Sequence, residues 1–153
     1  MPHIHDQYDF VTAVYIVHAG RVLLVNHPRY GKWINPGGHI ELDEDPEEAL
    51  YREIAEETGL KVRILSSKHS VATEGTKALL TPNYMDVHEA NPPHKHIALI
   101  YFGVAEDDQH VLSDEHTEAR WFTQEDLRDP QYGLAPVIIF YAEEAMKLAA
   151  LDK

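Results

Sequence analysis

The sequence predicts an α+β protein, in which one mixed sheet packs against helices. Strand-like and helix-like segments are mixed along the chain, and predicted hairpins outnumber β-α-β units. The length of 153 residues is that of one ordinary domain. We therefore expect a single domain over residues 1–153 with one hydrophobic core.

The first elements form a predicted hairpin. Tyr8–His18 is rich in β-branched and aromatic residues, Ala19-Gly20 is typical of a turn, and Arg21–Val25 is the expected partner strand. The following segment, residues 27–36, contains Pro, Gly and Asn, which predicts a loop.

A helix is then marked at both of its ends. Asp45 suits the N-cap, Pro46 suits the first helical position, and Glu48 stands third, as in a capping box. Gly59 suits the C-terminal stop, so we expect a helix over residues 46–58.

The second half of the chain predicts more strands and two more helices. Strands are expected at residues 61–72, 79–88, 96–105 and 118–122. The third of these is apolar on both faces, which is typical of a central strand. A capping-box pattern from Thr123 opens a short helix, and Pro136 opens an amphipathic helix that runs to about Ala150.

Composition and charge exclude several classes of protein. Hydrophobic residues make up 44% and charged residues 25%, which argues against a disordered chain. The net charge of −13 disfavours binding to duplex nucleic acid or to an anionic membrane surface. Cysteine is absent, which removes disulfides, thiolate zinc sites and thiol nucleophiles and suits a reducing cytoplasm. No apolar run approaches the roughly 20 residues of a membrane span.

Three glutamates of the predicted 46–58 helix are the most informative residues. Glu53 lies three residues before Glu56 and four before Glu57, so all three share one helix face. Each like-charge pair at this spacing costs about 0.2–0.5 kcal/mol, and a divalent cation with oxygen ligands would relieve the repulsion. The glycines of Gly37-Gly38 let the backbone approach closely, so a carbonyl can join such a site. The alternative is a solvated acidic helix face.

These residues resemble the Nudix box, the signature of the Nudix hydrolase family. That pattern is Gly, five residues, Glu, seven residues, then Arg-Glu-aliphatic-any-Glu-Glu-any-Gly-aliphatic. Every defined position is matched, by Gly38, Glu44, Arg52, Glu53, Ile54, Glu56, Glu57, Gly59 and Leu60. The similarity extends beyond the box to most of residues 8–150.

The resemblance implies an α/β/α sandwich that hydrolyses a diphosphate linked to another moiety, usually in a nucleotide. Mg²⁺ or Mn²⁺ would be held by Glu53, Glu56 and Glu57, with the Gly37 carbonyl as a further ligand. Arg52 would orient Glu53, and Glu44 would be structural. For the proton of the attacking water, Glu56 and Glu57 are the first candidates and Glu115 is a candidate outside the box.

A second polar constellation lies in two predicted strands. Asp86 and His88 are two residues apart, as are His94 and His96, so each pair shares a strand face. The turn-like segment between them allows the strands to pair, which would bring the four side chains onto one sheet face. We interpret His88, His94 and His96, together with His39 of the box, as substrate-binding residues. A second metal site and a solvated strand end are the alternatives.

Two alternatives to a hydrolase remain open at this point. One is a catalytically silent Nudix domain that binds a nucleotide, against which the intact set of Arg52, Glu53, Glu56 and Glu57 argues. The other is a metal-binding protein without catalysis. The hydrolase hypothesis predicts a small nucleotide-type substrate, no duplex nucleic acid, no membrane and a cytoplasmic location. A homodimer is compatible with the sequence.

Overall fold

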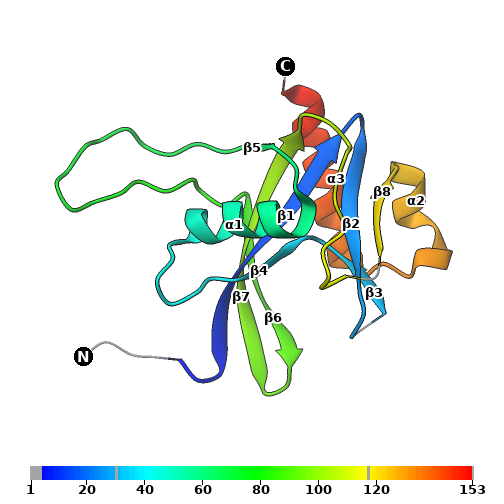
Figure 1. The fold of residues 1–153 in the computed structure, drawn as a ribbon, viewed down its shortest axis with the longest axis horizontal. Coiled ribbons are helices and arrows are strands. Elements are labelled where there is room, and N and C mark those ends of the chain that lie inside the picture. Colours follow the sequence, from blue (N-terminus) through cyan, green and yellow to red (C-terminus); the bar gives the residue numbers. More distant parts are fainter. Residues whose placement is uncertain (1–4, 30, 117, 153) are drawn as a thin grey trace.

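A computed structural model describes residues 5–29, 31–116 and 118–152, and its centre is a parallel pair of long strands. Strands β1 (Tyr8–His18) and β7 (His94–Ala105) run side by side from Tyr8↔Lys95 to Val17↔Val104. Both strands carry long apolar runs because they lie in the middle of the sheet, with helices on either side (Figure 1).

Antiparallel strands complete an eight-stranded mixed sheet around this pair. On the β1 side, β2 (Arg21–His27) and β4 (Gly37–His39) pair with β1, while β3 (Lys32–Ile34) and β8 (Glu118–Phe122) pair with β2. On the other side, β5 (Val62–Ile64) and β6 (Tyr84–Asn91) both pair with β7.

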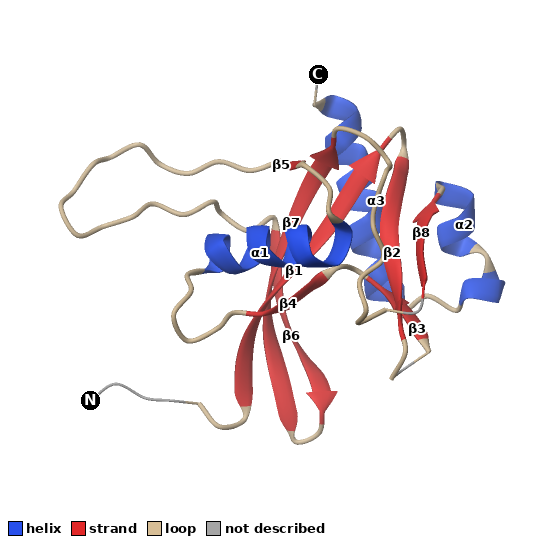
Figure 2. Cartoon of the chain, in the orientation of Figure 1, coloured by secondary structure: helices blue, strands red, loops and turns tan. Residues whose placement is uncertain are grey.

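Helices cover both faces of the sheet, which confirms the predicted sandwich (Figure 2). Helix α1 (Pro46–Thr58) buries Leu50 and Ile54 on one face, against Val14 and Ile16 of β1. Helix α3 (Pro136–Leu151) covers the other face with Tyr141, Ala142 and Ala145, beside the short α2 (Gln124–Arg128) and a 3-10 turn at Pro130–Tyr132.

The bounds of α1 are those that the sequence predicts. The Glu48 amide donates to Asp45 Oδ1 at 3.0 Å and the Asp45 amide donates to Glu48 Oε1 at 3.3 Å, which completes the capping box. Gly59 ends the helix in the left-handed region with φ 66°, and its amide donates to the Ala55 carbonyl. Firm ends matter because the register of α1 decides which glutamates face the sheet.

The predicted strands at 61–72 and 79–88 are wrong in their extent. Only Val62–Ile64 and Tyr84–Asn91 are strands, and residues 65–83 form the long excursion of Figure 2. One edge of β7 accepts both β5 and β6, one after the other, so the chain between them must leave the sheet. Asn83 closes the excursion, since its side chain donates to the Leu65 carbonyl and accepts from the Phe102 amide.

The predicted loop at residues 27–36 also contains an unexpected strand. Lys32–Ile34 forms β3, and Gly37–His39 forms β4 directly afterwards. These strands of three residues are too short to show a period of two. Within the part of the chain that the structure describes, no helix combines the length and the hydropathy needed to traverse a bilayer.

Candidate active site

The glutamates of α1 lie against the backbone of β4. The Gly37 amide donates to Glu57 Oε2 at 2.9 Å. A Cβ atom on Gly38 would lie 2.3 Å from Glu53 Oε1, and one on Gly37 would lie 2.1 Å from the Thr12 carbonyl oxygen. Glycine at both positions therefore lets β4 fit between β1 and the carboxylates, which is the close approach that the sequence predicts.

Arg52 donates hydrogen bonds to four residues around this site. Its guanidinium forms a two-pronged pair with Glu44, through Nε–Oε2 at 2.6 Å and Nη2–Oε1 at 2.8 Å. Nη1 donates to Glu53 Oε1 at 2.9 Å and to Glu56 Oε2 at 3.2 Å, and Nη2 also reaches the His39 carbonyl at 3.1 Å. One cation thus holds two of the three glutamates in place and ties α1 to β4.

Burial and mutual repulsion perturb the acidity of the inner glutamates. Burial raises the pKa of the Glu57 carboxyl to about 8, with repulsion from Glu53 and Glu115 adding to it and the Gly37 amide opposing it. Burial also raises the pKa of Glu53, against the lowering effect of Arg52. Arg52 lowers the pKa of Glu44 through their hydrogen bonds. Negative charge at Glu53 and Glu57 is therefore unfavourable unless a further cation joins Arg52 at the site.

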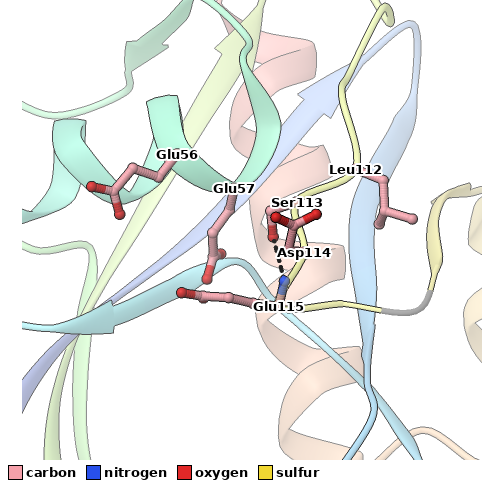
Figure 3. A pocket seen from close by; sticks show the side chains of 6 residues that line it. All are labelled: Glu56, Glu57, Leu112, Ser113, Asp114 and Glu115. Atoms are coloured by element: carbon pink, nitrogen blue, oxygen red, sulfur yellow. Dashed lines mark hydrogen bonds between the residues drawn. The ribbon is translucent and has the colours of Figure 1, made fainter.

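A loop after β7 brings two more residues to Glu57. The Val111 amide donates to the Thr58 carbonyl at 2.8 Å, which fixes this loop to the end of α1. Figure 3 shows the Glu115 carboxylate approaching that of Glu57 from the loop. Three atoms that could bind a metal ion lie within 4.8 Å of one another, one each from Glu57, Glu115 and His116. The cavity here has a volume of about 340 Å³ and is lined by Glu56, Glu57, Leu112, Ser113, Asp114 and Glu115.

His116, like Glu57, is a buried member of this group. Its Nε2 lies 3.2 Å from Glu57 Oε1, yet neither ring nitrogen has a hydrogen bond within the described chain. Burial lowers the pKa of His116, and the nearby His27 lowers it further, so the ring is neutral at pH 7. The sequence does not single out His116 among eleven histidines, and only the folding of the loop onto α1 identifies it.

The structure also brings together the four histidines predicted to bind substrate, but elsewhere on the sheet. We call Asp9, His39, His88, His94 and His96 the histidine cluster. The ring centroids of His39, His88 and His94 lie 5.0, 5.4 and 5.7 Å from that of His96. The predicted pairing of the two strands is confirmed, with His88 opposite His96. Asp9, which the sequence does not associate with this group, lies 2.6 Å from His94 Nε2 and 3.3 Å from His39 Nε2.

Comparisons with known proteins agree with one another on the family. The model of the NUDIX domain matches residues 9–139. The CTP pyrophosphohydrolase of Escherichia coli K12 is 30% identical over 144 residues, which cover 92% of this chain and 93% of that protein. A MutT-like protein of Streptomyces ambofaciens is 39% identical over 72 residues, so this match spans about half of each protein, 46% of this chain and 47% of the relative.

Solved structures resemble the whole arrangement of strands and helices. The crystal structure of a NUDIX-family hydrolase from Clostridium perfringens superposes with a TM-score of 0.79 at 30% identity, covering 92% of this chain and 97% of that one. A second example, the solution structure of the ORF135 protein of E. coli, gives a TM-score of 0.63 at 25% identity and covers 95% and 94% of the two chains.

Proposed function

Because the chain belongs to the Nudix hydrolase family, we propose that it is a metal-dependent pyrophosphohydrolase that cleaves a nucleoside diphosphate linked to another moiety. The observation that carries this proposal is the group of Glu53, Glu56 and Glu57 on one face of α1, tied to β4 by Arg52. The CTP pyrophosphohydrolase of E. coli, similar over nearly its whole length, supports a nucleotide as the substrate.

The donor atoms of the site fit a hard divalent cation. Carboxylate oxygens and backbone carbonyls are the ligands that Mg²⁺ and Mn²⁺ prefer. The raised pKa of Glu53 and of Glu57 reflects burial without enough positive charge, which a divalent ion would supply. We assign Glu53, Glu56 and Glu57 as its ligands and the Gly37 carbonyl as a further one, with Mg²⁺ or Mn²⁺ as the cofactor.

Each residue has a separate task in the proposed reaction. When bound, a divalent ion neutralises the diphosphate and lowers the pKa of a water molecule. Arg52 keeps the carboxylates of Glu53 and Glu56 aimed into the site, and the Gly37 amide holds that of Glu57. Attack by the water on phosphorus breaks the bridging P–O bond of the diphosphate, and a carboxylate accepts the proton that the water loses.

The proton acceptor is one of three carboxylates around the cavity. Both oxygens of Glu57 face a neighbour, the Gly37 amide and His116 Nε2. Glu56 and Glu115 are exposed residues that line the cavity with it (Figure 3). Separate Glu56→Gln, Glu57→Gln and Glu115→Gln variants distinguish them, because only loss of the base removes the acidic limb of the pH–rate profile.

The histidine cluster is the proposed point of contact with the rest of the substrate. His39 follows Gly37 and Gly38 in the chain, and its carbonyl accepts from Arg52. Its side chain joins His88, His94 and His96. Imidazole rings can donate hydrogen bonds to a base or a sugar. A cytoplasmic location completes the proposal, since a chain without cysteine suits a reducing compartment.

A substrate panel tests the proposal directly. Nucleoside triphosphates including CTP, nucleotide sugars and dinucleoside polyphosphates are incubated with Mg²⁺ or Mn²⁺, and phosphate and nucleotide release are measured. We expect hydrolysis of at least one compound, abolished by EDTA and by the double variant Glu53→Gln/Glu57→Gln. Nucleotide binding without any release across the panel would instead indicate a catalytically silent domain.

A further inference from the structure

The histidine cluster occupies the sheet face opposite to α1, beyond the part that α3 covers. Asp9 of β1 is the register partner of His96 of β7, and His88 of β6 is the partner of His96 on the other side. Ala98 and Ile100, two and four residues after His96, belong to the core under α3. Because alternate residues of a strand share a face, His94 and His96 point to this same side.

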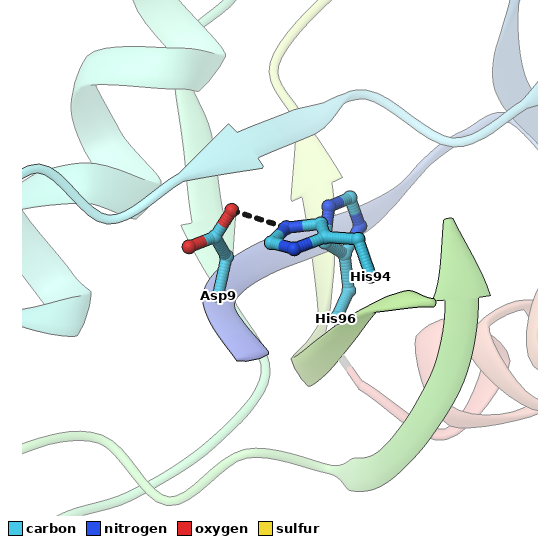
Figure 4. Close-up of side chains that lie close together, drawn as sticks. All are labelled: Asp9, His94 and His96. Atoms are coloured by element: carbon cyan, nitrogen blue, oxygen red, sulfur yellow. Dashed lines mark hydrogen bonds and ion pairs between the residues drawn. The ribbon is translucent and has the colours of Figure 1, made fainter. Parts of the chain in front are cut away.

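Three side chains of the cluster offer ligand atoms at one point. One atom each from Asp9, His94 and His96 lie within 4.8 Å of one another. Figure 4 shows the two rings and the carboxylate converging from β1 and β7. Metal–nitrogen and metal–oxygen bonds of about 2.0–2.2 Å require somewhat shorter separations. The three residues are partly exposed, so small side-chain rotations suffice.

The charge of the cluster favours a cation over an anion. The Asp9 carboxylate lies at its centre, with Oδ2 contacting both His94 Nε2 and His39 Nε2. A phosphate or carboxylate ligand would meet this negative charge, whereas a metal ion would replace the proton between Asp9 and His94.

Hydrogen bonds to residues outside the histidine cluster orient His88. His88 Nδ1 lies 2.8 Å from Asp86 Oδ1, and the Tyr141 hydroxyl of α3 donates to Asp86 Oδ2 at 2.6 Å. This chain fixes the ring of His88 beside His96 and directs its Nε2 away from Asp86. Carboxylates that hold the outer nitrogen of a histidine are typical supports of metal sites.

We propose that Asp9, His94 and His96 bind a divalent transition-metal ion of the Zn²⁺ or Co²⁺ type, with His39 and His88 beside them as further ligands. Two imidazoles and one carboxylate suit such ions, whereas Mg²⁺ prefers oxygen ligands alone. This site is separate from the carboxylates of α1. It goes beyond the proposed hydrolysis and does not depend on it.

Metal titration of the full chain, produced without a polyhistidine tag and stripped with EDTA, tests this site. Co²⁺ is followed by its visible absorption bands, and Zn²⁺ affinity is measured by competition with a chromophoric chelator. The Glu53→Gln/Glu57→Gln variant, which lacks the carboxylate site of α1, is expected to bind one equivalent of Co²⁺, and the wild type is expected to show the same bands. Loss of a residue that only hydrogen-bonds a metal ligand lowers metal affinity roughly 10–100-fold. His94→Ala/His96→Ala removes two of the proposed ligands themselves, so it is expected to weaken Co²⁺ binding at least about 100-fold.

Two controls keep the result interpretable. His69→Ala removes an exposed histidine outside the cluster and is expected to leave Co²⁺ binding unchanged. Asp9→Asn keeps the size of the side chain but removes its charge. It serves as the test variant if His94→Ala/His96→Ala does not fold. Histidine ring signals of the wild type in NMR spectra are expected to shift at His94 and His96 on Zn²⁺ addition.

Three results would overturn the proposal. They are binding that survives in His94→Ala/His96→Ala or in Asp9→Asn, binding that disappears in Glu53→Gln/Glu57→Gln, and no binding of either ion by the wild type. The activity of the α1 site is measured separately with Mg²⁺, so failure of one proposal does not imply failure of the other.

Discussion

Replacing Glu57 by glutamine is expected to stabilise the metal-free protein while it abolishes turnover. Glu57 is buried between the Gly37 amide and His116. A glutamine fits the same place, because its carbonyl oxygen can accept from Gly37 and its amide can donate to the neutral His116 Nε2. The variant therefore removes a negative charge from a buried position without removing a hydrogen-bond acceptor.

The size of the effect follows from the acidity of Glu57. Its pKa is about 8 in the folded chain, against 4.5 for an ordinary glutamate, so the folded state binds the proton more tightly. The stability from this group is fully present below pH 4.5 and is lost as the pH rises through 8. At about 1.4 kcal/mol per pH unit, the upper limit of the loss is about 5 kcal/mol. Water in the cavity reduces it, and we expect Glu57→Gln to gain about 1–3 kcal/mol at pH 8.

Thermal and urea denaturation in EDTA at pH 5 and pH 8 measure this gain. One kcal/mol shifts the Tm of a domain of this size by roughly 2–4 °C, so the variant should melt roughly 2–12 °C above the wild type at pH 8 and close to it at pH 5. Glu56→Gln is the matched control, since it removes the same charge from the exposed side of α1 and should change stability by less than about 0.5 kcal/mol. Adding Mg²⁺ should stabilise the wild type but not Glu57→Gln.

The expected loss of activity is orders of magnitude in kcat, because the variant removes a ligand charge from the metal site. A Glu57→Gln protein that is less stable than the wild type at pH 8 would refute the reasoning. So would a stability difference that is the same at pH 5 and pH 8. Near-normal turnover would exclude Glu57 from the ligands.

Three other substitutions probe the surroundings of the site. Arg52→Lys should cost about 1–3 kcal/mol in urea denaturation and lower kcat, because one ammonium group cannot pair with Glu44 and Glu53 at once as the guanidinium does; unchanged kcat would show that Arg52 does not position the carboxylates. Gly38→Ala should lower kcat at least about tenfold with little change in KM, because the added Cβ would lie 2.3 Å from Glu53 Oε1 and would displace that carboxylate. A normal kcat would mean that the Glu53 side chain moves freely. Asp45→Ala should cost about 0.5–2 kcal/mol by calorimetry through loss of the N-cap, and Asp45→Asn, which keeps the cap, should cost less; equal losses would assign the effect to the ion pair with Lys77 instead.

Local signals in the sequence predict α1 and the glutamates on it correctly. The capping box at Asp45 and the stop at Gly59 act within a few residues, so the helix has the predicted bounds. The same bounds fix which face carries Glu53, Glu56 and Glu57. Helices α1 and α2 both begin at a capping box, in which side-chain to backbone bonds span only three residues.

Strand extent and long-range contacts could not be predicted in the same way. The apolar residues of 61–72 favour a strand, but the β7 edge beyond Ile64 is taken by β6, and the segment leaves the sheet. His116 reaches Glu57 only because the loop after β7 is bonded to the end of α1. Nothing in the neighbourhood of His116 in the sequence indicates this contact.

The sequence by itself determined the family, the position of the capped helix and the spacing of three glutamates on one face, because these depend on periodicity and on bonds between residues close in the chain. Only the tertiary structure decided that β4 passes over those glutamates, that Glu115 and His116 join them, and that Asp9 and His39 complete the histidine cluster. Such contacts depend on the register of strands far apart in the sequence, and register is settled by the packing of the whole sheet between its two layers of helices.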